Sequence, residues 1–200
     1  MLTYLLDAVM GVEARMPPLL LPEAHDTHDT QKVPALGASP IAYSGCCLAL
    51  SAPLIEYLQS LLPQPPALSL SIGSGFGLLE AYLMAEPKAH NVIGIEVEPS
   101  SNQYLPASHH RLVHGTRFLD PLAAEATTWL FVYPRRVGLL DEYLTEYGNT
   151  SLERVIWAGP QADWGDYKGC FAGWHVQERG ADEVGGKPWE LIAVAKKRPS

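Results

Sequence analysis

The sequence predicts an α/β fold with a mostly parallel sheet, and three observations lead to this prediction. Strand-like apolar runs alternate with helix-like segments through most of the 200 residues. A glycine-rich turn, residues 73–77, stands directly between one such run and the helix that follows it. Close to the C-terminus, two strand-like runs are joined by a Gly-Gly connector, which is typical of an antiparallel hairpin.

The composition fits one globular domain, because 47% of the residues are hydrophobic and can form a core. The net charge of −8 argues against binding to nucleic acid or an anionic membrane, since both require clustered Lys and Arg. Asp7 interrupts the apolar N-terminal stretch, and no apolar window is long enough to span a membrane. The cysteines, Cys46, Cys47 and Cys170, lack the spacing of a disulfide framework, so we expect free thiols and a cytoplasmic protein.

The first 50 residues are expected to form an arm or lid packed on a core domain of residues 51–200. Residues 3–10 suit a short helix, and residues 17–40 contain five prolines that favour an irregular arm. Residues 25–29, His-Asp-Thr-His-Asp, include metal-ligating types. Flanking prolines and the lack of a distant ligand favour a polar loop there, so we predict no metal site.

Apolar, helix-like patterning resumes at residues 41–62. Ser51 followed by Pro53 is typical of an N-cap and first turn, which predicts a helix over residues 52–62. A buried strand is expected at residues 68–72, immediately before the glycine turn.

The turn itself is expected to approach a ligand closely. Glycine permits positive φ and leaves room beside the main chain, and a helix predicted over residues 78–85 directs free N–H groups at the same place. A strand at residues 91–97 comes next, with Glu96 near its end, where a carboxylate can accept hydrogen bonds from a ribose diol.

The second half of the chain continues the alternation. Residues 99–110 are too short and too rich in turn formers for a full crossover helix. The later elements are expected as a strand at 111–114, a short helix at 121–126, a strand at 128–133, a helix at 138–147 closed by Gly148, a strand at 152–158, and hairpin strands at 174–183 and 188–197.

From residue 52 to residue 197 this order resembles the class I S-adenosylmethionine-dependent methyltransferases. The resemblance rests on a GxGxG turn at Gly73, Gly75 and Gly77, on Glu96, and on the terminal hairpin. It implies a Rossmann-like fold with a mostly parallel seven-stranded sheet, helices on both faces and a C-terminal antiparallel β-hairpin. A nicotinamide-binding domain more often has GxGxxG and further parallel units, so the spacing counts against that reading.

The resemblance also implies S-adenosylmethionine as cofactor. The main chain of the turn is then expected near its amino acid and ribose, with Glu96 at the ribose hydroxyls and Val97 beside the adenine. The expected cofactor contacts are Ser71, Gly73, Ser74, Gly75, Gly77, Glu96, Val97 and Thr116.

The chain departs from the family at two positions. Ser71 stands where many members have an acid that holds the methionine amino group, and Thr116 lies where an acid often faces the adenine. Asp120 is the nearest carboxylate to the second position. Glu80, in the first turn of the helix after the glycines, is expected to stabilise that helix at least as much as to contact a ligand.

The substrate is expected beyond the ends of the fourth and fifth strands. Tyr133, Arg135, Arg136 and Trp164 lie there and suit an anionic or phenolic small molecule. The candidate catalytic groups are His110, His114, Asp163 and Tyr133, with His109 a further candidate base. The strand tip lacks the Asn/Asp-Pro-Pro-Tyr motif of methyltransferases acting on bases or glutamine.

The sequence therefore predicts O- or N-methylation of a small molecule. The alternative is a methyltransferase-like protein without transfer activity, which acts as a binding partner or catalyses another reaction of a biosynthetic intermediate. A homodimer is possible, since Trp129 and the hairpin edge could support pairing.

Overall fold

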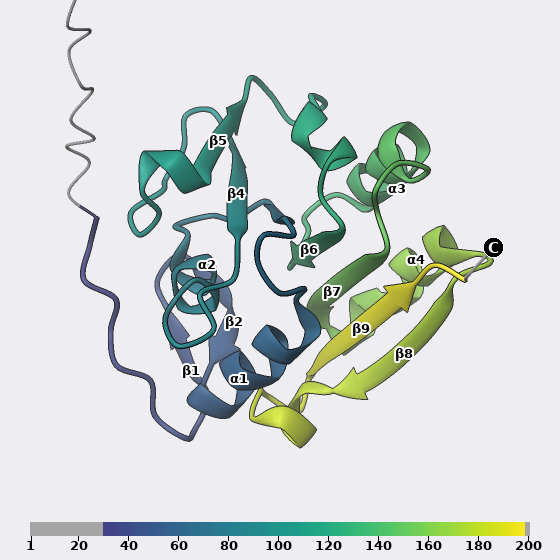
Figure 1. Ribbon diagram of the computed structural model, residues 1–200. Coiled ribbons are helices and arrows are strands. Elements are labelled where there is room, and N and C mark those ends of the chain that lie inside the picture. Colours follow the sequence, from purple (N-terminus) through teal and green to yellow (C-terminus); the bar gives the residue numbers. More distant parts are fainter. Residues whose placement is uncertain (1–29, 199–200) are drawn as a thin grey trace, which may run out of the picture.

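The structure is a computed structural model that describes residues 30–198, and its centre is a seven-stranded sheet (Figure 1). The expectations for residues 3–10 and 25–29 lie outside the described residues. The strands follow the order β5-β4-β3-β6-β7-β9-β8. Their bounds are β3 Ser69–Ile72, β4 Val92–Val97, β5 His110–Val113, β6 Thr128–Val132, β7 Arg154–Pro160, β8 His175–Gly180 and β9 Glu190–Lys196.

The sheet is parallel from β5 to β7 and antiparallel at its C-terminal edge. Ser71 of β3 lies opposite Gly94 of β4 on one side and Leu130 of β6 on the other. The last strand, β9, enters between β7 and β8 and runs antiparallel to both. The predicted sheet, including its terminal hairpin, is confirmed.

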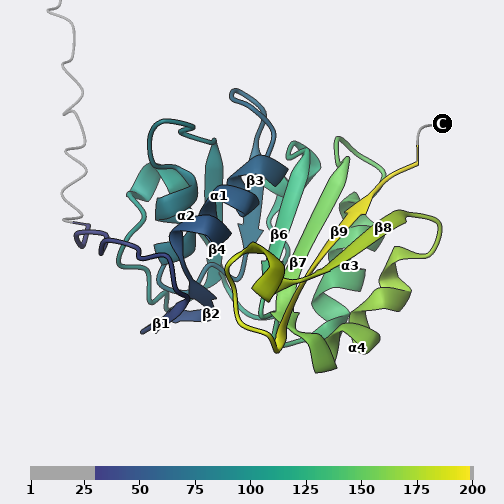
Figure 2. The same cartoon turned by 90° about the horizontal axis from the view of Figure 1, so that it is seen from below.

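Helices cover both faces of this sheet (Figure 2). α1 and α2 pack with Leu130 and Ile156 on one face, and α3 and α4 pack with Trp129 and Phe131 on the other. Successive side chains of β6 thus pack into the cores on opposite faces of the sheet, because side chains alternate between the two faces along a strand. The bounds are α1 Ala52–Leu61, α2 Leu78–Leu83, α3 Val137–Tyr147 and α4 Trp164–Lys168, with 3₁₀ turns η1 Ala107–His109, η2 Pro121–Ala124, η3 Gln161–Asp163, η4 Gly169–Phe171 and η5 Ala181–Val184.

The start of α1 follows the predicted capping pattern. The Ser51 hydroxyl accepts a hydrogen bond from Leu54 N at 3.2 Å, and Pro53 occupies the first turn. Ser51 Oγ also donates to the Gly185 carbonyl at 2.7 Å, which ties α1 to the connection between β8 and β9. Between residues 30 and 198, no helix combines the length and apolar character needed to cross a bilayer.

Two local expectations were wrong. Residues 41–50 form a small hairpin, β1 (Ile41–Tyr43) and β2 (Cys46–Leu50), instead of continuing a helix-like pattern. Gly45 has φ +75° and reverses the chain between the two strands. The connection from β8 to β9 is also longer than the Gly-Gly turn expected, because η5 precedes the two glycines.

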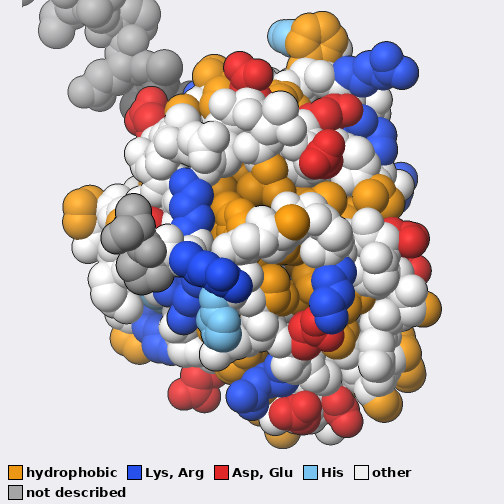
Figure 3. Space-filling view, turned by 90° about the vertical axis from the view of Figure 1, so that its right-hand side faces the viewer, with side chains coloured by type: hydrophobic (Ala, Val, Ile, Leu, Met, Phe, Trp, Pro, Cys, Tyr) orange, Lys and Arg blue, Asp and Glu red, His pale blue; other side chains and the backbone are white. Residues whose placement is uncertain are grey.

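The face that carries α3, α4 and β8 exposes hydrophobic side chains in a hollow bordered by charged ones (Figure 3). β8 is the edge strand there and pairs with β9 alone among the described strands. Most of the residues of β8 are exposed. The homodimer stays a prediction.

Candidate functional site

The glycine turn lies at the carboxyl end of β3 and is tied to β4. Gly73 N and Ser74 N both donate to the Ile95 carbonyl, at 2.9 and 3.0 Å. All three glycines have positive φ, between +58° and +85°. A Cβ on Gly77 would lie 2.6 Å from Leu105 Cγ, so this position has no room for a side chain. The spacing of the motif is therefore set by backbone conformation and packing.

A cavity of about 690 Å³ opens beside this turn. Six of the predicted cofactor residues form part of its wall: Gly73, Ser74, Gly75, Glu96, Val97 and Thr116. Ser71 and Gly77 do not reach the wall. Gly77 begins α2, whereas Ser71 is buried and acts through another residue.

Glu96 is held between the turn and its own strand. Its Oε2 accepts a hydrogen bond from Gly75 N at 2.7 Å, and its Oε1 accepts one from Val97 N at 2.8 Å. A carboxylate oxygen can accept more than one hydrogen bond, so both atoms keep capacity for ligand hydroxyls. The side chain is thus oriented on the cavity wall before any ligand arrives.

Glu80 is a second carboxylate on the same cavity. It is 2% exposed, and its Oε1 accepts a hydrogen bond from Ser71 Oγ at 2.5 Å. Its Oε2 has no hydrogen-bond partner among residues 30–198. Burial raises the pKa of Glu80 from 4.5 to about 7, and the hydrogen bond from Ser71 opposes that shift. A buried carboxylate oxygen without a donor suits a ligand cation.

Part of the wall of this cavity comes from the end of the segment, residues 1–50, that was expected to form an arm or lid. Tyr43, Gly45, Cys46 and Cys47, all from the β1–β2 hairpin, lie on its wall. The contact with the glycine turn is close, since a Cβ on Gly75 would lie 3.0 Å from the Gly45 carbonyl oxygen. The sequence pattern was read as helix-like here, so the hairpin that makes this contact was not expected.

A second cavity, of about 480 Å³, adjoins the first at the ends of β6 and β7. Cys47, Tyr133, Pro134 and Arg135 line both cavities. The other residues on its wall are Val137, Trp157, Pro160, Asp163, Asp166 and Tyr167. A ligand in the first cavity and a ligand in the second would therefore meet at the tip of β6.

Tyr133 stands at this meeting point in a left-handed conformation, with φ +48°. Its hydroxyl donates to Glu190 Oε1 at 2.9 Å. Glu190 is 1% exposed and also accepts from Ala49 N and Lys187 N, each at 3.1 Å. Burial, then the hydrogen bond to Glu190, raises the pKa of Tyr133, so its phenol stays a protonated donor.

Solved structures of other proteins share the fold of this chain. The precorrin-6y C5,15-methyltransferase of Geobacter metallireducens GS-15 aligns with 82% of this chain and 100% of its own, at 11% identity and a TM-score of 0.58. The tRNA (m1A58) methyltransferase of Aquifex aeolicus aligns with 76% of this chain and 70% of its own, at 11% identity and a TM-score of 0.53. This chain has the class I methyltransferase fold.

Other comparisons set the limits of that likeness. A putative O-methyltransferase of Nostoc punctiforme PCC 73102 aligns at 16% identity and a TM-score of 0.50, over 72% of this chain. This chain spans about half of that protein, 55% of its length. No protein-family model and no curated protein matches the sequence.

Within the class I methyltransferase fold, the predicted histidines lie away from both cavities. His110 Nε2 is 3.0 Å from Ser100 Oγ, and His114 pairs with Glu98 on the surface. Neither histidine lines a cavity wall. Of the predicted catalytic groups, Asp163 and Tyr133 are the two that line the second cavity.

Three of the predicted substrate residues, Tyr133, Arg135 and Arg136, line the first cavity, whereas Trp164 lines neither cavity. Both guanidinium ends of Arg136 bind Glu142 at 2.6 Å, and Nη2 also donates to the Thr116 carbonyl at 2.7 Å. Trp164 packs behind Trp157, with ring centroids 5.1 Å apart, and does not line the second cavity. Arg135 lines both cavities and has no ion-pair or hydrogen-bond partner in the described part of the chain.

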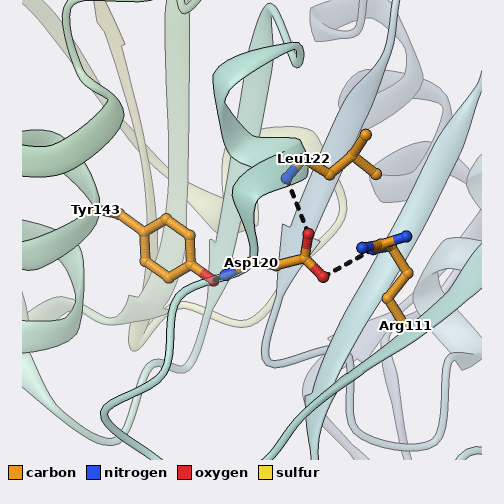
Figure 4. Close-up of polar contacts among 4 residues, drawn as sticks. All are labelled: Arg111, Asp120, Leu122 and Tyr143. Atoms are coloured by element: carbon orange, nitrogen blue, oxygen red, sulfur yellow. Dashed lines mark hydrogen bonds and ion pairs between the residues drawn. The ribbon is translucent and has the colours of Figure 1, made fainter.

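Asp120 has a structural role in this fold (Figure 4). Its carboxylate accepts from Arg111 Nε at 2.7 Å and from Leu122 N at 2.9 Å. Its own N–H donates to the Tyr143 hydroxyl at 3.0 Å. Asp120 is 3% exposed and lies off the wall of the first cavity, so it does not replace the family acid expected near Thr116.

Proposed function

We propose that this protein binds S-adenosylmethionine and transfers its methyl group to an oxygen or nitrogen of a small molecule. The observation that supports this most directly is the pair of carboxylates, Glu80 and Glu96, on one cavity beside the glycine turn. S-adenosylmethionine has a cationic α-ammonium and a ribose diol, the two groups that such carboxylates suit. The buried Oε2 of Glu80, which has no hydrogen-bond partner among residues 30–198, would accept a hydrogen bond from the ammonium. Glu96 would accept hydrogen bonds from the diol.

Glu80 also accounts for the serine in the glycine-turn motif. Ser71 donates to Glu80 Oε1, so the serine orients an acid that comes from α2 instead of supplying one itself. An acidic group is thereby retained at the same end of the cavity, and it carries its negative charge as the pH rises above its pKa of about 7. A nicotinamide dinucleotide suits this wall poorly, because its diphosphate would face an additional carboxylate.

When bound, the cofactor supplies an electrophilic methyl group on a sulfonium. The chain's own residues would then align the acceptor, since transfer to oxygen or nitrogen needs proximity, alignment and at most a general base. Tyr133 would pack against the ligands at the junction of the cavities, since its hydroxyl already donates to Glu190, and Asp163 is the predicted base on the acceptor side. His110 and His114 would have no direct part.

The deciding measurement is calorimetric titration of the full chain with S-adenosylmethionine and S-adenosylhomocysteine. Glu80→Gln should weaken both at least about tenfold, because a hydrogen bond to a charged group contributes about 1.5–3 kcal/mol. Glu56→Gln, an exposed carboxylate on α1, removes the same charge away from the cavity and should leave affinity unchanged. Absence of binding by either ligand would contradict the proposal.

The position of His110 and His114 favours a second candidate, a protein that keeps the fold and the cofactor site but transfers no methyl group. Incubation with methyl-labelled cofactor and a metabolite extract separates the two. Label in a small-molecule product supports transfer. Tight cofactor binding without any labelled product supports the second candidate.

A further inference from the structure

The loop after β5 brings an exposed aromatic side chain to the wall of the first cavity. Phe118 is 61% exposed, and it lines this cavity together with Gly115 and Thr116. Its N–H donates to the Gly115 carbonyl at 3.1 Å, and a Cβ on Gly115 would lie 3.4 Å from Phe118 Cδ2. The turn therefore holds the ring beside Gly115, with most of its surface available to a bound molecule.

This part of the cavity lies one strand beyond Glu96. In the sheet, β5 is the neighbour of β4 on the side away from β3. Glu80 reaches the wall from α2, which follows β3, whereas Glu96 belongs to β4 and Phe118 follows β5. In the cofactor, the ribose joins the base to the part that carries the ammonium. A cofactor with its ammonium at Glu80 and its ribose at Glu96 would therefore extend its base toward Phe118.

The main-chain acceptors around Phe118 already have donors. The Thr116 carbonyl accepts a hydrogen bond from Arg136 Nη2 at 2.7 Å. The Val113 carbonyl accepts one from Glu98 N at 3.0 Å. The loop is thus held in place by hydrogen bonds that the amino group of a base would have to share.

Two carboxylates lie next to this loop, and both have partners. Asp120 accepts from Arg111 Nε at 2.7 Å, and Glu98 pairs with His114 on the surface. Neither Asp120 nor Glu98 lines the cavity. Among residues 30–198, the two carboxylates already assigned to the ammonium and the ribose are the only ones on the cavity wall. The base end of the described wall therefore offers apolar side chains and hydroxyls.

We propose that Phe118 stacks against the adenine of the cofactor, and that the site recognises the base by its face and discriminates weakly between purines that differ at C6. This inference rests on the proposed function and deepens it, because it names the group that takes over from the family acid expected near Thr116. Stacking tolerates a change at C6 because every base has a π-face. A site that hydrogen-bonds the 6-amino group would instead reject an analogue that lacks it.

S-inosylhomocysteine tests the selectivity, because it carries a 6-oxo group in place of the 6-amino group of S-adenosylhomocysteine and is otherwise the same molecule. Calorimetric titration of the full chain should give dissociation constants for the two ligands that agree within about fivefold. A larger loss of affinity with S-inosylhomocysteine would overturn the proposal, because it would show that the amino group is read by a hydrogen bond.

Variants test the part played by the ring. Phe118→Ser should weaken both ligands at least about fivefold, whereas Phe118→Tyr keeps the ring and should bind them as the unsubstituted protein does. Leu112→Ser is the matched control, since Leu112 is 44% exposed on β5 and lines neither cavity. Thermal melting establishes that all three variants are folded. If Phe118→Ser binds both ligands as tightly as Leu112→Ser, the proposal is wrong.

Adenosine and inosine separate the failure of this inference from the failure of the proposed function. Tight S-adenosylhomocysteine binding that is insensitive to Phe118→Ser would overturn the inference alone. Binding of both nucleosides that depends on Phe118, in a protein that does not bind S-adenosylhomocysteine, would overturn the proposed function and support stacking on Phe118. Failure of all of these ligands to bind would overturn both.

Discussion

Glu80 is buried, and one of its carboxylate oxygens accepts a hydrogen bond while the other has no partner among the described residues. Its ionisation is linked to folding. Its pKa rises from 4.5 to about 7 on burial, so the folded protein holds a proton that the unfolded chain releases. Stability from this group is therefore lost as the pH rises from about 4.5 to about 7, and it levels off above that range. The expected loss in the free energy of unfolding is about 3 kcal/mol.

Urea denaturation of the cofactor-free protein between pH 4.5 and 8.5 measures this slope. Glu80→Gln cannot ionise at this position, so its unfolding free energy should vary less over the same range. Glu56→Gln is the control and should retain the slope of the unsubstituted protein. An unchanged slope in Glu80→Gln would show that another group titrates.

The element that covers the cofactor cavity, the β1–β2 hairpin, depends on Gly45. A Cβ there would lie 2.1 Å from the Phe76 ring, and φ is +75°. Gly45→Ala should therefore lower stability by about 1 kcal/mol or more and weaken S-adenosylhomocysteine binding, because Phe76 also lines the cavity.

Gly37→Ala provides the matched comparison. No atom lies within 4 Å of a Cβ at Gly37, so its affinity and melting temperature should stay close to those of the parent. Combining Gly45→Ala with Phe76→Ala should recover the steric part of the loss. If Gly45→Ala binds as tightly as Gly37→Ala, the hairpin does not form part of the site.

The elements that the sequence predicted are those with a periodic or capped pattern. The strand–turn–helix unit at β3 and α2, the capped helix α1 and the amphipathic α3 all appear where expected. β2 was misassigned because Leu48, Ala49 and Leu50 are all buried, so the strand shows no alternation. α4 has five residues, which are too few to show the 3.6-residue hydrophobic period of a helix.

The same reasoning applies to the site. Glycine spacing and Glu96 are local signals, so the sequence could place them on one cavity. Glu190 accepts hydrogen bonds from Tyr133, 57 positions earlier in the chain, and from Ala49, 141 positions earlier. A local sequence pattern cannot predict contacts between residues so far apart in the chain. Glu80 is the exception, because an acid in the first turn of α2 is close enough along the chain to reach back to Ser71 on β3.

At the scale of the whole molecule, β9 joins the edge strand β8 to the rest of the sheet. It makes a register with β7 along seven positions and with β8 along six, and residues Glu190 to Ala195 are all buried. A charge on this strand would enter both the sheet and the core.

Val194→Asp is therefore expected to cost about 3 kcal/mol or more of unfolding free energy, because it buries a carboxylate without a partner. Gln177 lies opposite Val194 on β8 and is exposed. Gln177→Asp should stay within about 0.5 kcal/mol of the parent in the same denaturation experiment. Similar losses in both variants would argue against the internal position of β9.

The internal position of β9 also bears on synthesis. β9 follows the other six strands of the sheet along the chain, so a strand that is paired on both sides is the last of the seven to emerge from the ribosome. Until then β7 presents an open edge beside an unfilled gap, and β8 has no neighbour in the sheet. Open strand edges in incomplete sheets promote association between chains. The sheet therefore closes only after β9 has been translated, and until then the edge of β7 is open to pairing with another chain.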